Sequence, residues 1–377
     1  MNRVLNGIDR IDIWKKLLSG KRVGVMTHAP AVDLNYSRSA DILFQHADVR
    51  MFWGPEHGLD GVAQAGDAVD TATDSRTGLP VYSLFRSSGK TFAETVGGVD
   101  VVVCDFCDIG SRFYTYISSM SDAMIECAKQ HVPFIVLDRP NPIGGIRCDG
   151  PLLKEGFSSF VGRFPIPVRH GMTLGEAARF FNERFDIHCE LTVVPVSGWK
   201  RGMEFEELGR TWLNPSPNMP SADCARIYTG TCLIEGTNLS EGRGTTRPYE
   251  IIGAPFLDPF KLSNAFNAFR VPGVCTCPIR FRPTFNKYKD EACGGVQFIL
   301  TDRKNAACFE AGIRFLDILR NEFTGFEFRE NGVVFDQLIG SDLYRTGKIT
   351  ADELLEQSRE ECFEFQKGIR EFLLYAE

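Results

Sequence analysis

Short apolar runs that alternate with helical patterns constrain the fold of this 377-residue chain more than any other feature. Each run is too short for a helix and is bounded by turn residues, which is typical of the buried strands of a parallel sheet. The runs occupy residues 23–26, 49–53, 81–84, 100–104, 132–137 and 191–196. Helical spacing separates several of them, as at residues 39–46, 120–129 and 173–183. This alternation predicts an α/β fold with a Rossmann-like, doubly wound parallel sheet.

The pattern changes near residue 200. Beyond it, strand-like stretches at 274–281 and 296–301 and helical stretches at 306–319 and 352–377 no longer alternate regularly. The chain is also long for a single hydrophobic core. We therefore expect a Rossmann-like domain in residues 1–200 and a C-terminal α+β ancillary domain in residues 201–377. The last hundred or so residues offer little chemistry, and we expect them to serve in packing and in forming walls.

Charge and hydropathy exclude several classes of partner. The net charge is −7 and no basic stripe is present, which argues against a nucleic-acid partner. No segment approaches the roughly 18–20 consecutive apolar residues that cross a bilayer, so no membrane partner is expected. Residues 1–9 contain no apolar h-region, and the sequence as given therefore predicts a cytoplasmic protein. A periplasmic or secreted protein that had been trimmed is the alternative.

The sequence predicts neither a cofactor nor a metal. The first strand leads into Thr27-His-Ala-Pro30 rather than a G-x-G-x-x-G loop, so no glycine turn is available to hold a pyrophosphate. The twelve cysteines include one C-x-x-C pair, Cys104 and Cys107, but no second pair that would complete a zinc site. We interpret most cysteines as reduced and buried.

Polar clusters follow several of the predicted strands. The most compact is W-G-P-E-H-G at 53–58, where Glu56 and His57 lie between two glycines. A carboxylate held in such a turn is a candidate general acid or nucleophile. Because the carboxyl ends of parallel strands meet at one edge of a sheet, we expect further polar residues to line that edge. They are Asp105, Arg112, Tyr114 and Tyr116 after one strand, and Asp138, Arg139 and Asn141 after another.

A second dense cluster lies in the C-terminal half. Residues 235–248 contain Glu235, Asn238, Glu241 and Arg243 among several glycines. We expect this segment to cover the polar edge and form a cleft between the two domains. Carboxylates, amides and guanidinium groups without metal geometry suit a ligand with many hydroxyl groups, such as a sugar. Glycoside hydrolysis requires two acidic groups, or one acid and assistance from a substrate acetamido group.

Four motifs resemble the exo-β-N-acetylmuramidase family NamZ. They are GPEHG (54–58), DRPNP (138–142), PSPNMP (215–220) and EGTNLSEGRGT (235–245), and the resemblance extends over nearly the whole chain. It implies a Rossmann-like domain with a C-terminal ancillary domain and an active site in the cleft between them. The implied reaction releases N-acetylmuramic acid from the non-reducing end of peptidoglycan fragments, with a small carbohydrate as substrate. The family's catalytic glutamate corresponds to Glu56.

The lactyl ether of N-acetylmuramic acid carries a carboxylate, so a site that prefers this sugar needs a cation. Arginine offers a planar fork that matches a carboxylate, and Arg243 is our first candidate. The other predicted substrate-binding residues are His57, Asp105, Arg112, Tyr116, Arg139, Asn141 and Asn238.

The second catalytic group is left open between Glu235 and Glu241. Glu235 ranks first because it follows an apolar stretch that would hold it rigidly. A retaining, an inverting or a substrate-assisted reaction is compatible with the sequence, depending on the distance of this group from Glu56. The alternative function is that of a non-catalytic protein that binds cell-wall sugars.

Overall fold

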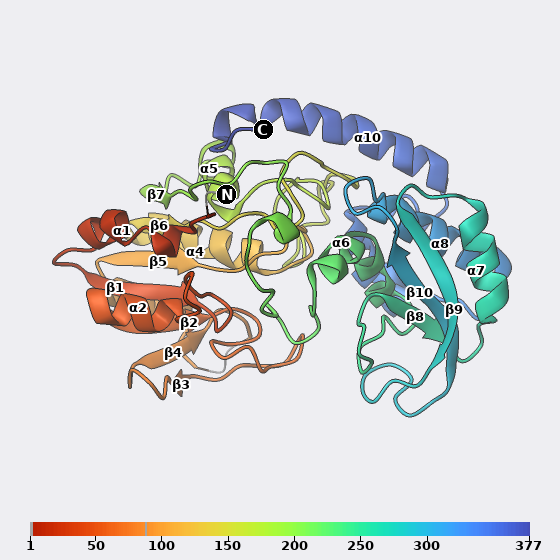
Figure 1. Ribbon diagram of the computed structural model, residues 1–377, viewed down its shortest axis with the longest axis horizontal. Coiled ribbons are helices and arrows are strands. Elements are labelled where there is room, and N and C mark those ends of the chain that lie inside the picture. Colours follow the sequence, from red (N-terminus) through yellow and green to blue (C-terminus); the bar gives the residue numbers. More distant parts are fainter. Residues whose placement is uncertain (1–2, 87–88) are drawn as a thin grey trace.

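The computed structural model describes residues 3–86 and 89–377, and it contains two β-sheets at opposite ends of the molecule (Figure 1). The larger sheet has seven strands in the order β3-β4-β2-β1-β5-β6-β7. All neighbours pair in parallel except β3 and β4, which are antiparallel. Its strands are β1 (Arg22–Thr27), β2 (Asp48–Gly54), β3 (Ala72–Thr73), β4 (Pro80–Ser83), β5 (Val101–Asp105), β6 (Phe134–Leu137) and β7 (Leu191–Val194).

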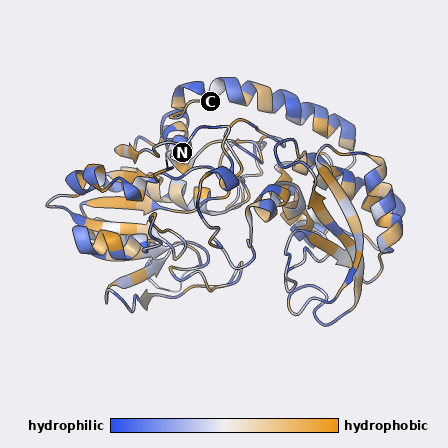
Figure 2. Ribbon diagram, in the orientation of Figure 1, coloured by the Kyte–Doolittle hydropathy of each residue, from blue (hydrophilic) through white to orange (hydrophobic). Residues whose placement is uncertain are grey.

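Helices cover both faces of this sheet. Side chains alternate along β5, so Val101 and Val103 pack with Trp14 of α1 (Ile11–Leu17) and Leu43 of α2 (Ser39–His46). On the other face, Val102 and Cys104 share a core cluster with residues of α4 (Tyr116–Gln130) and α5 (Leu174–Arg184). The short helix α3 (Phe92–Thr95) precedes β5. Figure 2 shows hydrophobic strands and mixed helices, which agrees with this layering. The predicted Rossmann-like α/β class is confirmed.

Counted alone, the six parallel strands follow the order 3-2-1-4-5-6 of a dinucleotide-binding sheet, in which the direction of progression reverses between β1 and β5. Ligands of such sheets bind in the crevice at this reversal. Here two interactions cross it: the backbone nitrogen of Cys107 donates to Nε2 of His28 at 2.9 Å, and Arg139, which forms a buried ion pair with Asp105, donates to the carbonyl oxygen of Val32 at 3.1 Å. The neighbouring strand ends are therefore tied to one another by protein groups.

The smaller sheet is antiparallel, with the order β8-β10-β9. Its strands are β8 (Ile251–Ala254), β9 (Val274–Phe281) and β10 (Cys293–Leu300), and α7 (Pro259–Ala268) and α8 (Cys308–Glu322) pack beside it. The helix α6 (Ala222–Thr231) contacts α8 through Gly230 and Gly312. A Cβ atom at Gly230 would lie 1.9 Å from a backbone oxygen of α8, so only glycine permits this approach. The predicted C-terminal α+β region is thus confirmed as a class.

The C-terminal helices are α9 (Val333–Ile339) and α10 (Ala351–Gly368). α10 runs from the smaller sheet back to the larger one (Figure 1). There the backbone nitrogen of Leu374 donates to Glu176 at 2.9 Å, and the hydroxyl of Tyr375 donates to Asp138 at 2.5 Å. Residues of the C-terminal region therefore pack on the first sheet. The division into domains 1–200 and 201–377 stays a prediction.

Within the described ranges, no helix combines the length and the apolar character that crossing a membrane requires.

Candidate active site

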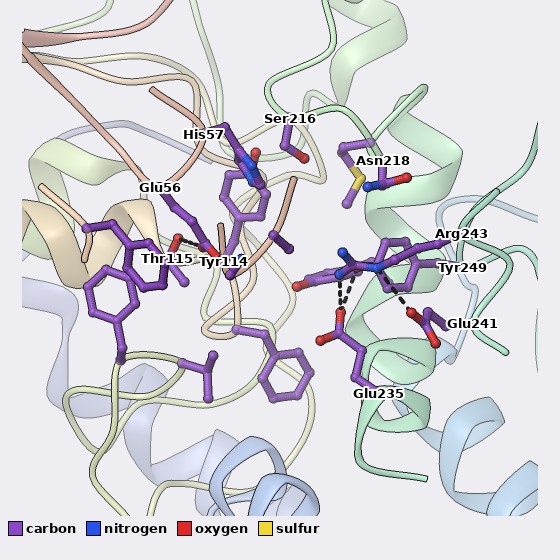
Figure 3. A pocket seen from close by; sticks show the side chains of 18 of the residues that line it. Glu56, His57, Tyr114, Thr115, Ser216, Asn218, Glu235, Glu241, Arg243 and Tyr249 are labelled. Atoms are coloured by element: carbon purple, nitrogen blue, oxygen red, sulfur yellow. Dashed lines mark hydrogen bonds and ion pairs between the residues drawn. The ribbon is translucent and has the colours of Figure 1, made fainter. Parts of the chain in front are cut away.

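A cavity of about 400 Å³ lies between the two sheet regions and is lined mainly by polar side chains. Glu56 and His57 stand on one wall, and Glu235, Glu241, Arg243 and Tyr249 stand on the other (Figure 3). The expectation that the turn after β2 and the glycine-rich segment share one cavity is confirmed. Further lining residues include Tyr114, Thr115, Ser216, Asn218, Tyr228, Asn286 and Lys287, with Phe85, Arg86, Phe160 and Arg329.

The turn that carries Glu56 requires glycine at both ends. A Cβ atom at Gly54 would lie 2.5 Å from the nitrogen of Leu59, and Gly58 has a φ of +78°. The half-buried Glu56 carboxylate is held at both oxygens. Oε1 accepts a hydrogen bond from the backbone nitrogen of Gly66 at 3.0 Å, and Oε2 accepts one from the hydroxyl of Thr115 at 2.8 Å. The position of this carboxylate is therefore fixed by two separate segments.

His57 is buried beside Glu56, with its Nδ1 atom 2.8 Å from the carbonyl oxygen of Ala63. A carbonyl oxygen only accepts hydrogen bonds, so Nδ1 carries the proton and donates it. Burial lowers the pKa of His57, and the ring is therefore neutral near pH 7. In this tautomer Nε2 is an acceptor.

Arg243 organises the opposite wall. Its Nη2 atom donates to Oε1 of Glu235 at 2.8 Å and to the hydroxyl of Tyr249 at 2.6 Å, and its Nε atom lies 3.1 Å from Oε1 of Glu241. The flanking Gly242 and Gly244 both have a φ of +81°, and a Cβ atom at either would lie within 2.7 Å of backbone atoms. The glycines next to Arg243 are thus a requirement of the local backbone.

Glu235 and Glu241 have different surroundings. Glu235 is the penultimate residue of the 3-10 helix η4 (Cys232–Gly236). Its Oε1 atom also accepts a hydrogen bond from Tyr249 at 2.7 Å. Burial would raise the pKa of Glu235, but the charge of Arg243 and these hydrogen bonds outweigh burial and lower the pKa. Glu241 is 2% exposed and lies between Arg243 and the ammonium group of Lys287, which is 3.0 Å from its Oε2 atom.

The remaining predicted site residues do not line this cavity. Asp105 and Arg139 form the buried ion pair described above. Arg112 is 1% exposed and donates to four backbone carbonyl groups, which belong to Pro151, Ile166, Leu338 and Ile339. Backbone carbonyls hold the two Nη atoms of Arg112 and the carboxylate of Asp105 holds Arg139, so these side chains point into the protein. These residues were predicted to bind the substrate, but the structure places them away from the cavity.

Three further predicted residues are bonded in the same inward way. The hydroxyl of Tyr116 donates to the carbonyl of Pro215 at 2.6 Å. Asn141 bridges the carbonyl of Met172 and the nitrogen of Ile143, and Asn238 bridges the carbonyl of Gly325 and the nitrogen of Glu327. Asp138, which was also expected at the polar edge, accepts hydrogen bonds from Thr173, Gly175 and Tyr375, and burial raises its pKa to about 6. These groups fix loops behind the cavity walls.

Several cavity residues were missed by sequence reasoning. Ser216 and Asn218 lie in the PSPNMP motif. Its prolines indicate a turn, but they do not indicate that its polar side chains face a cavity. Tyr249 follows Arg243 by six residues, and its proximity to that cluster was the available signal. Lys287 and Arg329 belong to the region that was expected to form walls but to offer little chemistry, and an isolated cation carries no sequence signal of its site. Among the described residues, no group of three or more His, Cys, Asp or Glu side chains is arranged to hold a metal ion.

Comparisons with known proteins agree with the four motifs. Family models described as exo-beta-N-acetylmuramidase NamZ, N-terminal and C-terminal, match residues 23–223 and 226–375. The chain is 41% identical to the peptidoglycan beta-N-acetylmuramidase NamZ of Bacillus subtilis (strain 168), over 99% of this chain and 92% of that protein. Crystal structures of two DUF1343 family proteins from Bacteroides fragilis NCTC 9343 are similar over 100% of both chains, with TM-scores of 0.90 and 0.78 at 32% and 28% identity.

Proposed function

Because this chain belongs to the exo-β-N-acetylmuramidase NamZ family, we propose that it is a glycoside hydrolase that releases N-acetylmuramic acid from the non-reducing end of peptidoglycan fragments. Membership of the family confirms the resemblance of the four motifs. The observation that carries the proposal is the pair of carboxylates, Glu56 and Glu235, on opposite walls of one polar cavity (Figure 3). A glycosidic bond placed between them would have an acidic group on either side.

We assign the role of general acid to Glu56. A general acid must alternate between its protonated and ionised forms during turnover. The Thr115 hydroxyl at 2.8 Å supports both, because a hydroxyl donates to a carboxylate and accepts from a carboxylic acid. The backbone nitrogen of Gly66 holds the other oxygen, so Oε2 is the atom whose protonation changes. The neutral His57 beside it offers Nε2 as an acceptor for a sugar hydroxyl.

We assign the role of the second carboxylate to Glu235. Both of its hydrogen bonds, from Arg243 and Tyr249, fall on Oε1, which leaves the lone pairs of Oε2 for the anomeric carbon or for a water molecule. The lowered pKa keeps this group ionised, as a nucleophile or base requires. Glu241 is enclosed between Arg243 and Lys287 and serves to balance their charge. A spacing of about 5–5.5 Å between the two catalytic carboxylates gives retention, and about 6.5–9.5 Å gives inversion.

The test is turnover of a chromogenic N-acetyl-β-muramide. We expect Glu56→Gln to lower the rate by about 10²–10⁴-fold, which is the usual contribution of a general acid. Glu155→Gln, at an exposed position, is the matched control and should leave the rate unchanged. If Glu56→Gln keeps more than about a tenth of the wild-type rate, Glu56 is not the acid. Tight binding of the muramide by the wild-type protein without turnover would instead support the alternative of a sugar-binding protein.

A further inference from the structure

The cavity contains more cations than its own carboxylates use. Release of N-acetylmuramic acid, rather than N-acetylglucosamine, requires recognition of the lactyl carboxylate, so one of these cations must meet it. Among the described residues that line the cavity, the cationic ones are Arg86, Arg243, Lys287 and Arg329. The hydrogen bonds and ion pairs that each cation already forms show which of them can donate to a bound carboxylate.

Two of these cations, Arg243 and Lys287, already have several partners. Arg243 contacts both Glu235 and Glu241 and donates to Tyr249. The ammonium group of Lys287 lies within 3.3 Å of the carbonyl oxygens of residues 234, 235 and 239, and 3.0 Å from Glu241. An ammonium group has only three hydrogens to donate. A substrate carboxylate at this end would also face two carboxylates of the protein, which would repel it.

Arg86 and Arg329 have donors to offer. No carboxylate of a described residue forms an ion pair with Arg86, whose guanidinium lies 5.1 Å from the centre of the Phe85 ring and has a long hydrogen bond of 3.4 Å to the carbonyl of Gly66. Arg329 is 48% exposed, and its ion-pair partner, Glu330, is 3.9 Å away. Both side chains are therefore available at the mouth of the cavity.

These two arginines are also placed beside the two catalytic candidates. Gly66, which accepts from Arg86, donates its own backbone hydrogen to Glu56. The backbone nitrogen of Arg329 donates to the carbonyl of Gly236, the residue after Glu235, at 2.9 Å. The segment that carries each arginine is thus hydrogen-bonded beside one of the two catalytic candidates, and both arginines line the same cavity as Glu56 and Glu235.

We propose that Arg86 and Arg329 form an anion subsite that binds the lactyl carboxylate of the terminal N-acetylmuramic acid. This inference rests on the proposed function and replaces Arg243 as the lactyl-binding residue. A guanidinium fork forms paired hydrogen bonds with a carboxylate, and the covered pair gains strength as the sugar displaces water from the mouth. The subsite therefore recognises the charge of the substituent, not its bulk.

The experiment compares binding of N-acetylmuramic acid with that of its methyl ester, a neutral analogue of nearly the same shape. Isothermal titration calorimetry is performed on the wild-type protein, on Arg86→Met and Arg329→Met, and on the double variant. We expect the wild type to prefer the acid by about tenfold or more, and each single variant to lose most of that preference. Affinity for the ester should stay within about twofold throughout.

Arg359→Met is the matched control, because Arg359 is 67% exposed on α10 and does not line the cavity. A wild type without preference for the acid, or a double variant that keeps the full preference, overturns the inference. Hydrolysis is measured in parallel with the chromogenic muramide. Turnover together with an unchanged preference refutes the subsite alone, whereas an arginine-dependent preference without turnover refutes the proposed hydrolase and leaves the subsite in place.

Discussion

The hydroxyl of Tyr249 offers a direct test of whether Glu235 acts as an ionised group. Tyr249 is 3% exposed, and its oxygen lies 2.7 Å from Glu235 and 2.6 Å from Arg243. Tyr249→Phe removes only this oxygen. The ring keeps its edge contact with Tyr228, at 4.7 Å between centroids, so the wall should keep its shape.

The size of the effect follows from the bond that is lost. A hydrogen bond to a charged group contributes about 1.5–3 kcal/mol, and about 1.36 kcal/mol of preference for the ionised form corresponds to one pKa unit. Arg243 remains 2.8 Å from the carboxylate and keeps part of the stabilisation. We therefore take the lower end of the energy range, about 1.5 kcal/mol, and expect the pKa of Glu235 to rise by about one unit in Tyr249→Phe.

The sign of the pH dependence is fixed by the lowered pKa of Glu235 in the native protein. Its ionised form contributes stability that is present above the unfolded-state pKa and is lost as the pH falls through the folded-state pKa. Loss of the Tyr249 hydroxyl removes one donor to Glu235 and reduces the difference between the folded-state and unfolded-state pKa of this group. Tyr249→Phe should therefore also be less stable than the wild type at neutral pH. The acid limb of kcat/KM should move to higher pH by about one unit while the alkaline limb stays in place.

The assay is the pH profile of kcat/KM on the chromogenic muramide, measured for the wild type, Tyr249→Phe and Tyr344→Phe. Tyr344 is a buried tyrosine that does not line the cavity, and its replacement should leave the acid limb where it is. An acid limb that is the same in Tyr249→Phe and the wild type would refute the assignment of Glu235.

Two further predictions concern Thr115, which lines the cavity, and Arg112, which does not. Thr115→Val removes the hydroxyl that holds Glu56, so kcat should fall by about tenfold with little change in KM, and Thr115→Ser should restore most of the rate in the same assay. An equal loss in both variants would count against the hydroxyl. Arg112→Met leaves four backbone carbonyl groups without their donor and should lower the free energy of unfolding by about 3 kcal/mol or more in urea titrations, whereas the exposed Arg359→Met should not. Equal midpoints for the two variants would contradict this role.

The seven-stranded sheet was largely predictable because most of its strands are marked by residues close to them in the sequence. The apolar runs and the Thr173 capping box fix strands and helices within a few residues of their bounds. The missed strand β8 contains Gly253, which masks its short apolar pattern. Helix α7 did carry a signal, since Asp258 accepts from its first turn and Pro259 occupies its first position.

The cavity was predictable only in part. A turn such as residues 54–58 places Glu56 at a strand end whatever the rest of the chain does, and the glycines around Arg243 mark an unusual backbone. Composition does not reveal whether a polar side chain at a strand end faces a ligand or turns inward. Arg112 turns inward because the carbonyls of residues 338 and 339 reach it, some 226 positions further along the chain. Only the tertiary structure contains that information.

The return of the chain to the first sheet has a consequence for biosynthesis. Strands β1 to β7 leave the ribosome long before Leu374 and Tyr375, yet Glu176 and Asp138 receive hydrogen bonds from these two residues. The wall with Arg243 is likewise translated after the wall with Glu56. A nascent chain that has been translated only as far as residue 234 therefore has the wall with Glu56 but lacks the wall with Glu235 and Arg243.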